Sequence, residues 1–405
     1  MAEYTDREHY IPLRKSDLVN LLCRDLAPDR AAAQLFRQLG ELISATFHYE
    51  YYKLLEELKD AYAPFDPDSV TVDVAPVGRD EKEKKLARLF DRLLLLMERA
   101  NFKRLGEADV AKAMTEVSDW GVNMNVDMSI FERLELFARG DEIGTRHLRR
   151  WPWIWRQETV RVPLYRRLVL FVKLKPNRRL PVWINTGNVF LKAFKEIPKA
   201  DLEMLLPGAR LQMPGQQQLK LGGSVVSGGA GVGYTLFGLF AKTALVLEQL
   251  PALALAAGTA LFGYGYKQYA GYQSTRNIFH LRLTQSLYFQ TIGNNLGVLF
   301  HLLDEAEEQE CREALLAYYY LWRYAGSNGW RAPDLDDYVE MDLERLAKLK
   351  VDFEIGDALA KLERLQLVTR NGEAYVAVPI ERALEVLDYA WDNYFKYNTE
   401  PTPQV

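Results

Sequence analysis

An acidic stretch near residue 300 carries the side chains best suited to bind a metal ion. The run HLLDEAEEQE places four candidate ligands at helical positions i, i+3, i+4 and i+7: His301, Asp304, Glu305 and Glu308. Residues at this spacing share one helix face, and imidazole with carboxylates can bind a divalent cation. Such a site usually takes carboxylates from a second helix, which the sequence does not reveal. A solvated or ion-paired acidic face is the alternative.

A second group interleaves arginine with tryptophan in the run RHLRRWPWIWR. Residues 146–199 contain fourteen Lys and Arg residues against two Glu residues. Indoles favour the membrane interface and guanidinium groups attract anionic lipid. The candidate lipid- or partner-binding residues are Arg146, Arg149, Arg150, Trp151, Trp153, Trp155, Arg166 and Arg167. Burial of the tryptophans in a sheet core is an equal alternative, and stacking on single-stranded nucleic acid is disfavoured.

The stretch from Gly222 to Tyr266 is almost free of charge, with only Lys242 and Glu248. Its glycines fit neither a dinucleotide-binding turn nor a phosphate loop, because the spacing fails and no Lys-Ser/Thr follows. A buried core hairpin and a membrane hairpin remain. Two apolar runs approach the ~20 residues of a bilayer span, which favours a two-span hairpin. Small residues at four-residue spacing would pack its helices: Gly229, Gly233, Ala254 and Gly258.

Charge around this hairpin predicts its orientation. Lys220, Lys267, Arg276 and Arg282 flank it, whereas only Lys242 lies near the turn. The positive-inside rule then predicts a multi-pass protein of the bacterial inner membrane with both termini in the cytoplasm. Two distant cysteines and an N-terminus without an apolar signal segment agree with that compartment.

Periodicity predicts the elements that would position these groups. Apolar spacing of three and four indicates helices over 15–62, 81–100, 106–114, 276–290 and 298–326. Alternation and β-branched residues indicate strands over 131–141, 156–165, 166–175 and 188–197, with turns at 138–144, 175–179 and 185–188. A short helix is expected over 198–208.

The last part of the chain predicts helices over 334–349 and 352–366, then two strands joined by Asn371-Gly372, a strong hairpin signal. This order is typical of a winged helix. The second helix is net acidic and would repel DNA phosphates, which favours protein contact. The basic sheet domain of the same chain is the expected partner.

We therefore expect an α+β, mostly helical protein with a small antiparallel sheet domain, a two-span transmembrane helical hairpin and a C-terminal winged-helix-like module. The predicted regions are the N-terminal helical region 1–120, the basic α+β sheet domain 121–220, the transmembrane hairpin 221–272, the acidic helical region 273–330 and the winged-helix-like module 331–405.

Several blocks resemble a known family. IPLRKSDLV, HYEYYKLLEELKDAYAPFDPD, FKEIPKADLEMLLP and LDEAEEQE are similar to the bacterial branch of an uncharacterised transmembrane family. Its hallmark is the domain of unknown function 3754, and its eukaryotic members resemble a mitochondrial transmembrane protein. The resemblance implies two central spans and membrane residence. It implies no activity and assigns no catalytic residue.

Motifs for catalysis are missing from the sequence. Neither GxSxG nor HExxH occurs, and the five histidines are scattered. We expect no catalytic residues and no cofactor. The leading hypothesis is a membrane-anchored interaction or assembly protein that binds anionic lipid and can form homo-oligomers through its hairpin. An oligomeric pore or transporter and an enzyme acting on a membrane-embedded substrate remain open, and nucleic acid is disfavoured.

Overall fold

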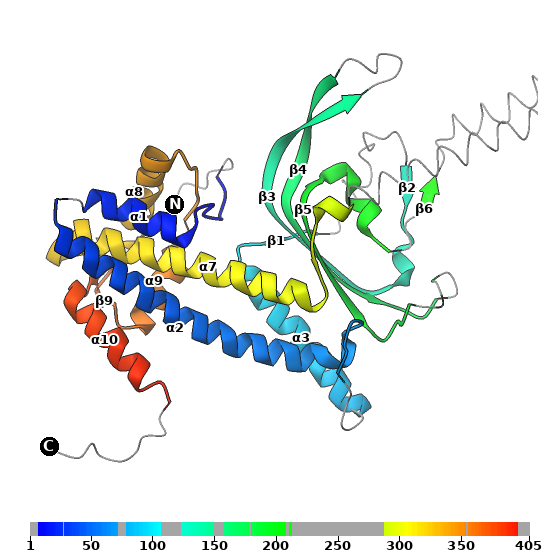
Figure 1. The fold of residues 1–405 in the computed structure, drawn as a ribbon, viewed down its shortest axis with the longest axis horizontal. Helices are drawn as coiled ribbons and strands as arrows, with labels where there is room; N and C mark the ends of the chain where they lie inside the picture. The colour runs from blue at the N-terminus through cyan, green and yellow to red at the C-terminus, as the bar shows by residue number, and fades with distance from the viewer. Residues whose placement is uncertain are drawn as a thin grey trace, which may run out of the picture.

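The computed structural model describes residues 7–26, 28–71, 78–106, 123–149, 157–177, 180, 182, 184–207, 210–212, 287–353 and 355–395. A twisted antiparallel sheet stands at one end, long helices extend from it, and a small C-terminal module packs at the far end of those helices (Figure 1).

The main sheet has five strands in the order β1-β3-β4-β5-β7. Its members are β1 (Lys103–Arg104), β3 (Phe131–Arg149), β4 (Gln157–Leu174), β5 (Val189–Pro198) and β7 (Thr291–Asn294). Alternate residues of β4 enter opposite cores: Val169 and Phe171 face the helices, whereas Leu168 and Leu170 face the other side. A separate pair joins β2 (Asn123–Asn125) to β6 (Arg210–Gln212).

Four helices form the layer beside the sheet and its extension. They are α1 (Lys15–Asp25), α2 (Arg30–Tyr62), α3 (Arg79–Arg99) and α7 (Leu296–Tyr320). The Asp29 side chain caps α2 by accepting from the Ala32 amide at 3.0 Å. The predicted helix over 15–62 is therefore two helices, with Pro28 between them. Short helical turns are η1 (Ala63–Phe65), η2 (Met128–Ile130) and η3 (Lys199–Leu205).

After α7 the chain forms a compact module. A π-turn η4 (Leu321–Ala325) and η5 (Gly326–Asn328) lead to β8 (Trp330–Arg331), α8 (Ala332–Ala347), α9 (Ile355–Arg364), β9 (Val368–Asn371), β10 (Ala374–Ala377) and α10 (Ile380–Asp392). The predicted hairpin is confirmed: Asn371 pairs with Ala374, and Gly372 takes a positive φ of 65°. Strand β8 completes a sheet in the order β8-β10-β9.

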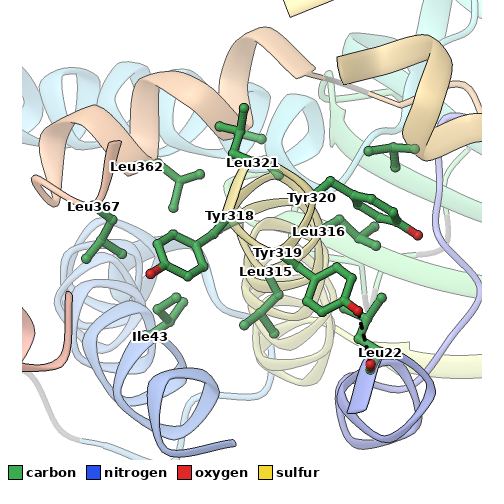
Figure 2. Close-up of a cluster of buried hydrophobic side chains, with 14 of the residues drawn as sticks. Leu22, Ile43, Leu315, Leu316, Tyr318, Tyr319, Tyr320, Leu321, Leu362 and Leu367 are labelled. Atoms are coloured by element: carbon green, nitrogen blue, oxygen red, sulfur yellow. Dashed lines mark hydrogen bonds between the residues drawn. The ribbon is translucent and has the colours of Figure 1, made fainter. Parts of the chain in front are cut away.

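Three consecutive tyrosines of α7 tie this module to the other helices. Tyr318, Tyr319 and Tyr320 are almost fully buried and point in different directions from the helix (Figure 2). The Tyr318 hydroxyl donates to the Val378 carbonyl at 2.8 Å. The Tyr319 hydroxyl donates to the Asp25 carboxylate at 2.8 Å, and the Tyr320 hydroxyl donates to the Asp342 carboxylate at 2.6 Å. Because each buried hydroxyl has an acceptor, the aromatic surface is buried without an unpaired donor.

The predicted turn over 138–144 is wrong, because β3 continues through it and pairs with β4 to Arg149. Its two glycines serve close packing instead. Gly140 has a φ of 74°, and a Cβ there would meet the Arg166 side chain; a Cβ at Gly144 would meet Leu164. The glycines thus allow side chains of β4 to cross over β3.

The predicted transmembrane hairpin and the multi-pass inner-membrane localisation are corrected. Within the described ranges, no helix combines the length and the apolar character that crossing a bilayer needs. Helices α2 and α7 are long, but charged residues recur along both and their apolar faces pack on protein. The fold is α+β with a five-stranded antiparallel sheet. Residues 221–272, including Gly229, Gly233, Ala254 and Gly258, lie outside the described residues.

Candidate functional site

Helix α7 carries an unusual set of buried polar side chains. Five of them are at most 8% exposed: Glu305, Gln309, Glu310, Arg312 and Glu313. Charged groups are rarely buried unless paired, because removal from water is costly. Helix α7 is covered by α2, α3, α9, the sheet and the N-terminal segment, so its charged residues must find partners inside the protein.

Glu305 lies at the centre of the first group, where α7 meets the sheet. Its carboxylate lies 2.9 Å from Arg139 Nη2 on β3 and 3.4 Å from Arg167 Nε on β4. His301 Nε2 lies 3.4 Å away, one turn earlier on α7. Arg139 also donates to the Ala100 carbonyl at 2.9 Å. Two strands and a helix are therefore joined by one carboxylate.

The electrostatics of Glu305 and Arg139 reflect this pairing. Burial alone would raise the pKa of Glu305, but the His301 contact and the charges of Arg139 and Arg167 outweigh it and lower the pKa to about 2. Burial lowers the pKa of Arg139, and the Glu305 charge opposes that effect. Glu305 is therefore ionised at neutral pH.

An N-terminal strap, residues 7–13, crosses this group. The Tyr10 ring lies between two guanidinium groups, with centroid distances of 3.8 Å to Arg139 and 5.1 Å to Arg312. Arg312 Nη1 donates to the Leu13 carbonyl at 2.5 Å, and the Ile11 amide donates to Gln309 at 3.2 Å. The strap thus covers charges from both the sheet and α7.

The same strap reaches the C-terminal module. Arg7 Nη1 lies 2.7 Å from Glu340 of α8. The Glu8 amide donates to the Lys350 carbonyl, and the Asp352 amide donates to the Glu8 carbonyl at 3.0 Å. Glu8 Oε1 accepts from the Asp141 amide of β3 at 3.0 Å. Seven residues therefore connect sheet, α7 and module.

A second buried group joins α7 to α9. Lys361 Nζ lies 3.2 Å from Glu310 and 3.4 Å from Glu313. Glu313 accepts from Gln309 at 2.8 Å and from Asn101 at 3.2 Å. Burial nonetheless raises the pKa of Glu313 to about 7, against the lowering effect of Lys361. We call the Glu305 group, the strap and the Glu313 group together the charged junction.

The C-terminal module, predicted as winged-helix-like, packs differently from the prediction. The sequence predicts that its acidic second helix, α9, contacts the basic sheet domain. Instead its apolar side is buried on α7, and its basic residues pair with carboxylates: Lys361 with α7, and Arg364 with Glu50 of α2 at 2.6 and 2.9 Å. The opposite side of α9, with Gly356, Asp357, Ala360 and Glu363, is exposed.

A groove of about 600 Å³ lies beside the junction, lined mainly by α1 and α2. Lys15 Nζ donates to Ser44 Oγ at 2.6 Å and lies 3.2 Å from Glu308. His48 Nδ1 lies 3.0 Å from Glu307. Lys15 of α1 therefore joins Ser44 of α2 to Glu308 of α7.

The four candidate metal ligands are not brought together. Glu305 pairs with arginines, Glu308 pairs with Lys15 and with Arg312 at 3.7 Å, and Asp304 is exposed. Within the part of the chain that the structure describes, no group of three or more His, Cys, Asp or Glu side chains is arranged to hold a metal. Glu305 and Glu308 are ion-paired, as in the alternative to a metal site that the sequence left open.

The candidate basic residues have different placements. Arg166 pairs with Glu142 and Arg167 with Glu305, so both belong to the sheet and the junction. The register places Arg146 opposite Val160 and Arg149 opposite Gln157. Arg150, Trp151, Trp153 and Trp155 lie outside the described residues.

Sequence reasoning missed Arg139, Tyr10 and Lys361. Arg139 had a signal: it stands next to the buried residues Phe137 and Ala138 of β3. Tyr10, between His9 and Ile11, and Lys361, between Ala360 and Leu362, offered none.

Fold and junction define an α+β protein in which a charged helix joins an antiparallel sheet to a small helical module. A family model described as a protein of unknown function, DUF3754, matches residues 165–297. The match runs from the later part of β4 to the first residues of α7. It confirms the resemblance to a domain of unknown function, while the bacterial branch and the mitochondrial relation stay predictions. No solved structure matches the chain.

Proposed function

We propose that this chain is a non-enzymatic interaction protein that contacts anionic lipid surfaces through one projecting β-hairpin. The observation that carries the proposal is the length of β3 and β4. Beyond Asp141 and Leu164 these strands pair only with each other among the described strands, because β1 meets β3 at 137–138 and β5 meets β4 at 164–173. We call residues 142–163 the arm; its strand parts, 142–149 of β3 and 157–163 of β4, extend past the helices in Figure 1.

The composition of the arm favours an anionic surface. It contains five arginines and two glutamates, and its run RRWPWIWR holds three indoles flanked by arginines. Guanidinium groups near an anionic membrane contribute about 1 kcal/mol each, and tryptophan favours the lipid–water interface. This contact is peripheral and needs no spanning helix.

The base of the arm is held firmly, which favours a positioning role. Lys199 Nζ lies 2.5 Å from Asp141, the Glu8 side chain accepts from the Asp141 amide, and Arg166 pairs with Glu142. A rigid base lets the charged junction transmit the orientation of the arm to the helices and the module. An assembly protein needs such a fixed relation between a binding surface and its body.

Flotation of the full chain with vesicles tests the proposal. We expect binding to phosphatidylglycerol vesicles and little binding to neutral phosphatidylcholine vesicles, with loss at high salt. The triple variant Arg146→Ala/Arg149→Ala/Arg161→Ala should lose roughly 3 kcal/mol, on the order of 100-fold in partitioning. The matched control removes three exposed cations of α3 in the variant Lys82→Ala/Lys84→Ala/Arg88→Ala.

Equal loss in both triple variants would reduce the effect to net charge and reject a role for the arm. Absence of flotation at low salt would reject lipid binding altogether. Retention of a single-stranded oligonucleotide by the wild type but not by the arm variant, without flotation, would favour nucleic acid instead.

A further inference from the structure

An exposed cluster of aromatic rings joins the middle of α2 to the end of α10. The Tyr49 ring contacts three rings edge to face: Tyr394 at 4.4 Å between centroids, Phe395 at 5.4 Å and Trp391 at 6.2 Å. The interplanar angles are 79°, 80° and 78°. Perpendicular packing directs ring faces in several directions and leaves negative quadrupole faces at the surface.

The cluster already holds a cation. Lys53 Nζ, one turn after Tyr49, lies 4.5 Å from the Tyr394 centroid and 5.2 Å from the Tyr49 centroid. Both distances fall within the ~6 Å range of cation–π attraction. Hydrogen bonding to Tyr394 raises the pKa of Lys53, so the side chain is charged at neutral pH. Two aromatic faces therefore converge on one positive charge.

We propose that this cluster is a binding site for a trimethylammonium group, of the choline type, and that Lys53 is its intramolecular occupant. Aromatic faces with a converging geometry are the known means of binding quaternary ammonium ions. A primary ammonium is strongly hydrated, whereas a trimethylammonium is bulky and weakly hydrated. The latter gives up less hydration when it replaces Lys53 on the two rings.

A ligand can reach the aromatic cluster from solvent, and the Lys53 side chain can leave it. Lys53 lies on the exposed face of α2, so its side chain can swing into solvent. Trp391 is 44% exposed and Phe395 is 57% exposed, so among the described residues no other group closes the cluster. Holding a lysine in one rotamer costs side-chain entropy, which is recovered on displacement.

Charge next to the cluster favours a cation over an anion. Glu50 stands three residues before Lys53 on α2, and its charge raises the pKa of Lys53. Arg364 balances that carboxylate through two hydrogen bonds of 2.6 and 2.9 Å. An anion would face negative ring faces and a carboxylate, and a neutral ligand would gain nothing from the ring quadrupoles.

Titration of the full chain with tetramethylammonium chloride, followed by calorimetry and by tryptophan fluorescence, tests this site. Lys53→Ala removes the resident cation and should tighten binding by roughly two- to fivefold over wild type. Tyr394→Leu removes a ring face and should abolish binding, whereas Tyr394→Phe keeps the face and should retain it. Tyr389→Leu, at an exposed tyrosine of α10 outside the cluster, is the matched control.

A neutral isostere, 3,3-dimethylbutanol, separates cation–π attraction from simple apolar contact. Binding of the alcohol as tightly as choline would overturn the proposal. The absence of saturable binding in Lys53→Ala, or full binding in Tyr394→Leu, would also overturn it.

Free choline and phosphatidylcholine vesicles distinguish the source of the group. Tight binding of only one of them assigns the ligand to a soluble molecule or to a lipid headgroup, and failure of both after tetramethylammonium binds would reject the choline class. This site does not rest on the proposed function, because it lies on α2 and α10 and its variants leave the arm unchanged.

Discussion

Arg139 of β3 and Glu305 of α7 form a buried ion pair of 2.9 Å, with side chains 5% and 10% exposed. Removal of one partner leaves a charge inside the protein, whereas removal of both does not. We expect Glu305→Leu to lower the free energy of unfolding by about 3–5 kcal/mol. Arg139→Met/Glu305→Leu should recover most of that loss. Urea denaturation followed by circular dichroism measures both.

The exposed pair Arg79–Glu83 of α3 is the control for this pair, with side chains 91% and 68% exposed. Its removal should change the free energy of unfolding by less than about 0.5 kcal/mol. A double variant as unstable as Glu305→Leu would show that packing volume, and not the unpaired charge, dominates at this position.

The lowered pKa of Glu305 predicts how the stability of the protein changes in acid. Its pKa is about 2 in the folded protein, below the ordinary value of 4.5. Because the folded pKa is lowered, the stabilisation is complete above pH ~4.5 and is lost as the pH falls through 2. The melting temperature of Glu305→Gln should therefore depend less on pH than that of wild type between pH 5 and 2. Parallel curves would contradict the lowered pKa.

The raised pKa of Glu313 predicts the opposite trend, a loss of stability as the pH rises toward neutral. Burial raises its folded pKa to about 7, above the ordinary 4.5. The folded state then holds the proton more tightly, so stability declines as the pH rises from 4.5 to 7. Glu313→Gln cannot ionise and should gain stability relative to wild type between pH 5 and 8, as measured by urea denaturation.

Asp336 of α8 has a pKa raised by burial to about 7 and contributes to the same pH range. Asp336→Asn is therefore a second, spatially separate test of the trend. If neither variant gains on wild type as the pH rises, both carboxyl groups are ionised in the folded protein at pH 5.

Substitutions of Tyr10 measure how much its ring contributes to the stability of the strap. Its ring lies 3.8 Å from Arg139 and 5.1 Å from Arg312, so the ring face and not the hydroxyl makes these contacts. Tyr10→Phe should unfold within about 0.5 kcal/mol of wild type, whereas Tyr10→Leu should lose roughly 1–2 kcal/mol. Thermal melts of the two variants give the comparison. Equal losses would assign the role to the hydroxyl.

Local pattern predicted much of the secondary structure. The helical spacing before Tyr320, the alternation in β5 and the Asn371-Gly372 turn all match observed elements. Each is a short-range signal, because a helix or a hairpin is formed by neighbours in sequence. Errors arose where distant residues decide. Gly140 and Gly144 resemble a turn in sequence, but side chains of the paired strand β4 occupy the space that a side chain would need.

The candidate site was partly visible in sequence. The acidic run of α7 stands out in the sequence as a candidate site, but its partners were not predictable, since Arg139, Arg167 and Lys361 come from three other elements. Spacing along one helix shows which carboxylates share a face. It does not show what covers that face.

The sequence by itself determined where most of the described helices and strands lie, that α7 is acidic, and that the arm is basic and rich in tryptophan. Only the tertiary structure decided that Glu305 pairs with arginines of the sheet, and that α9 faces α7. The physical reason is that burial and charge pairing depend on which distant segments meet in space. Tyr10 and Lys361 belong to the charged junction because they contact Arg139 and Glu310, which are distant in the sequence.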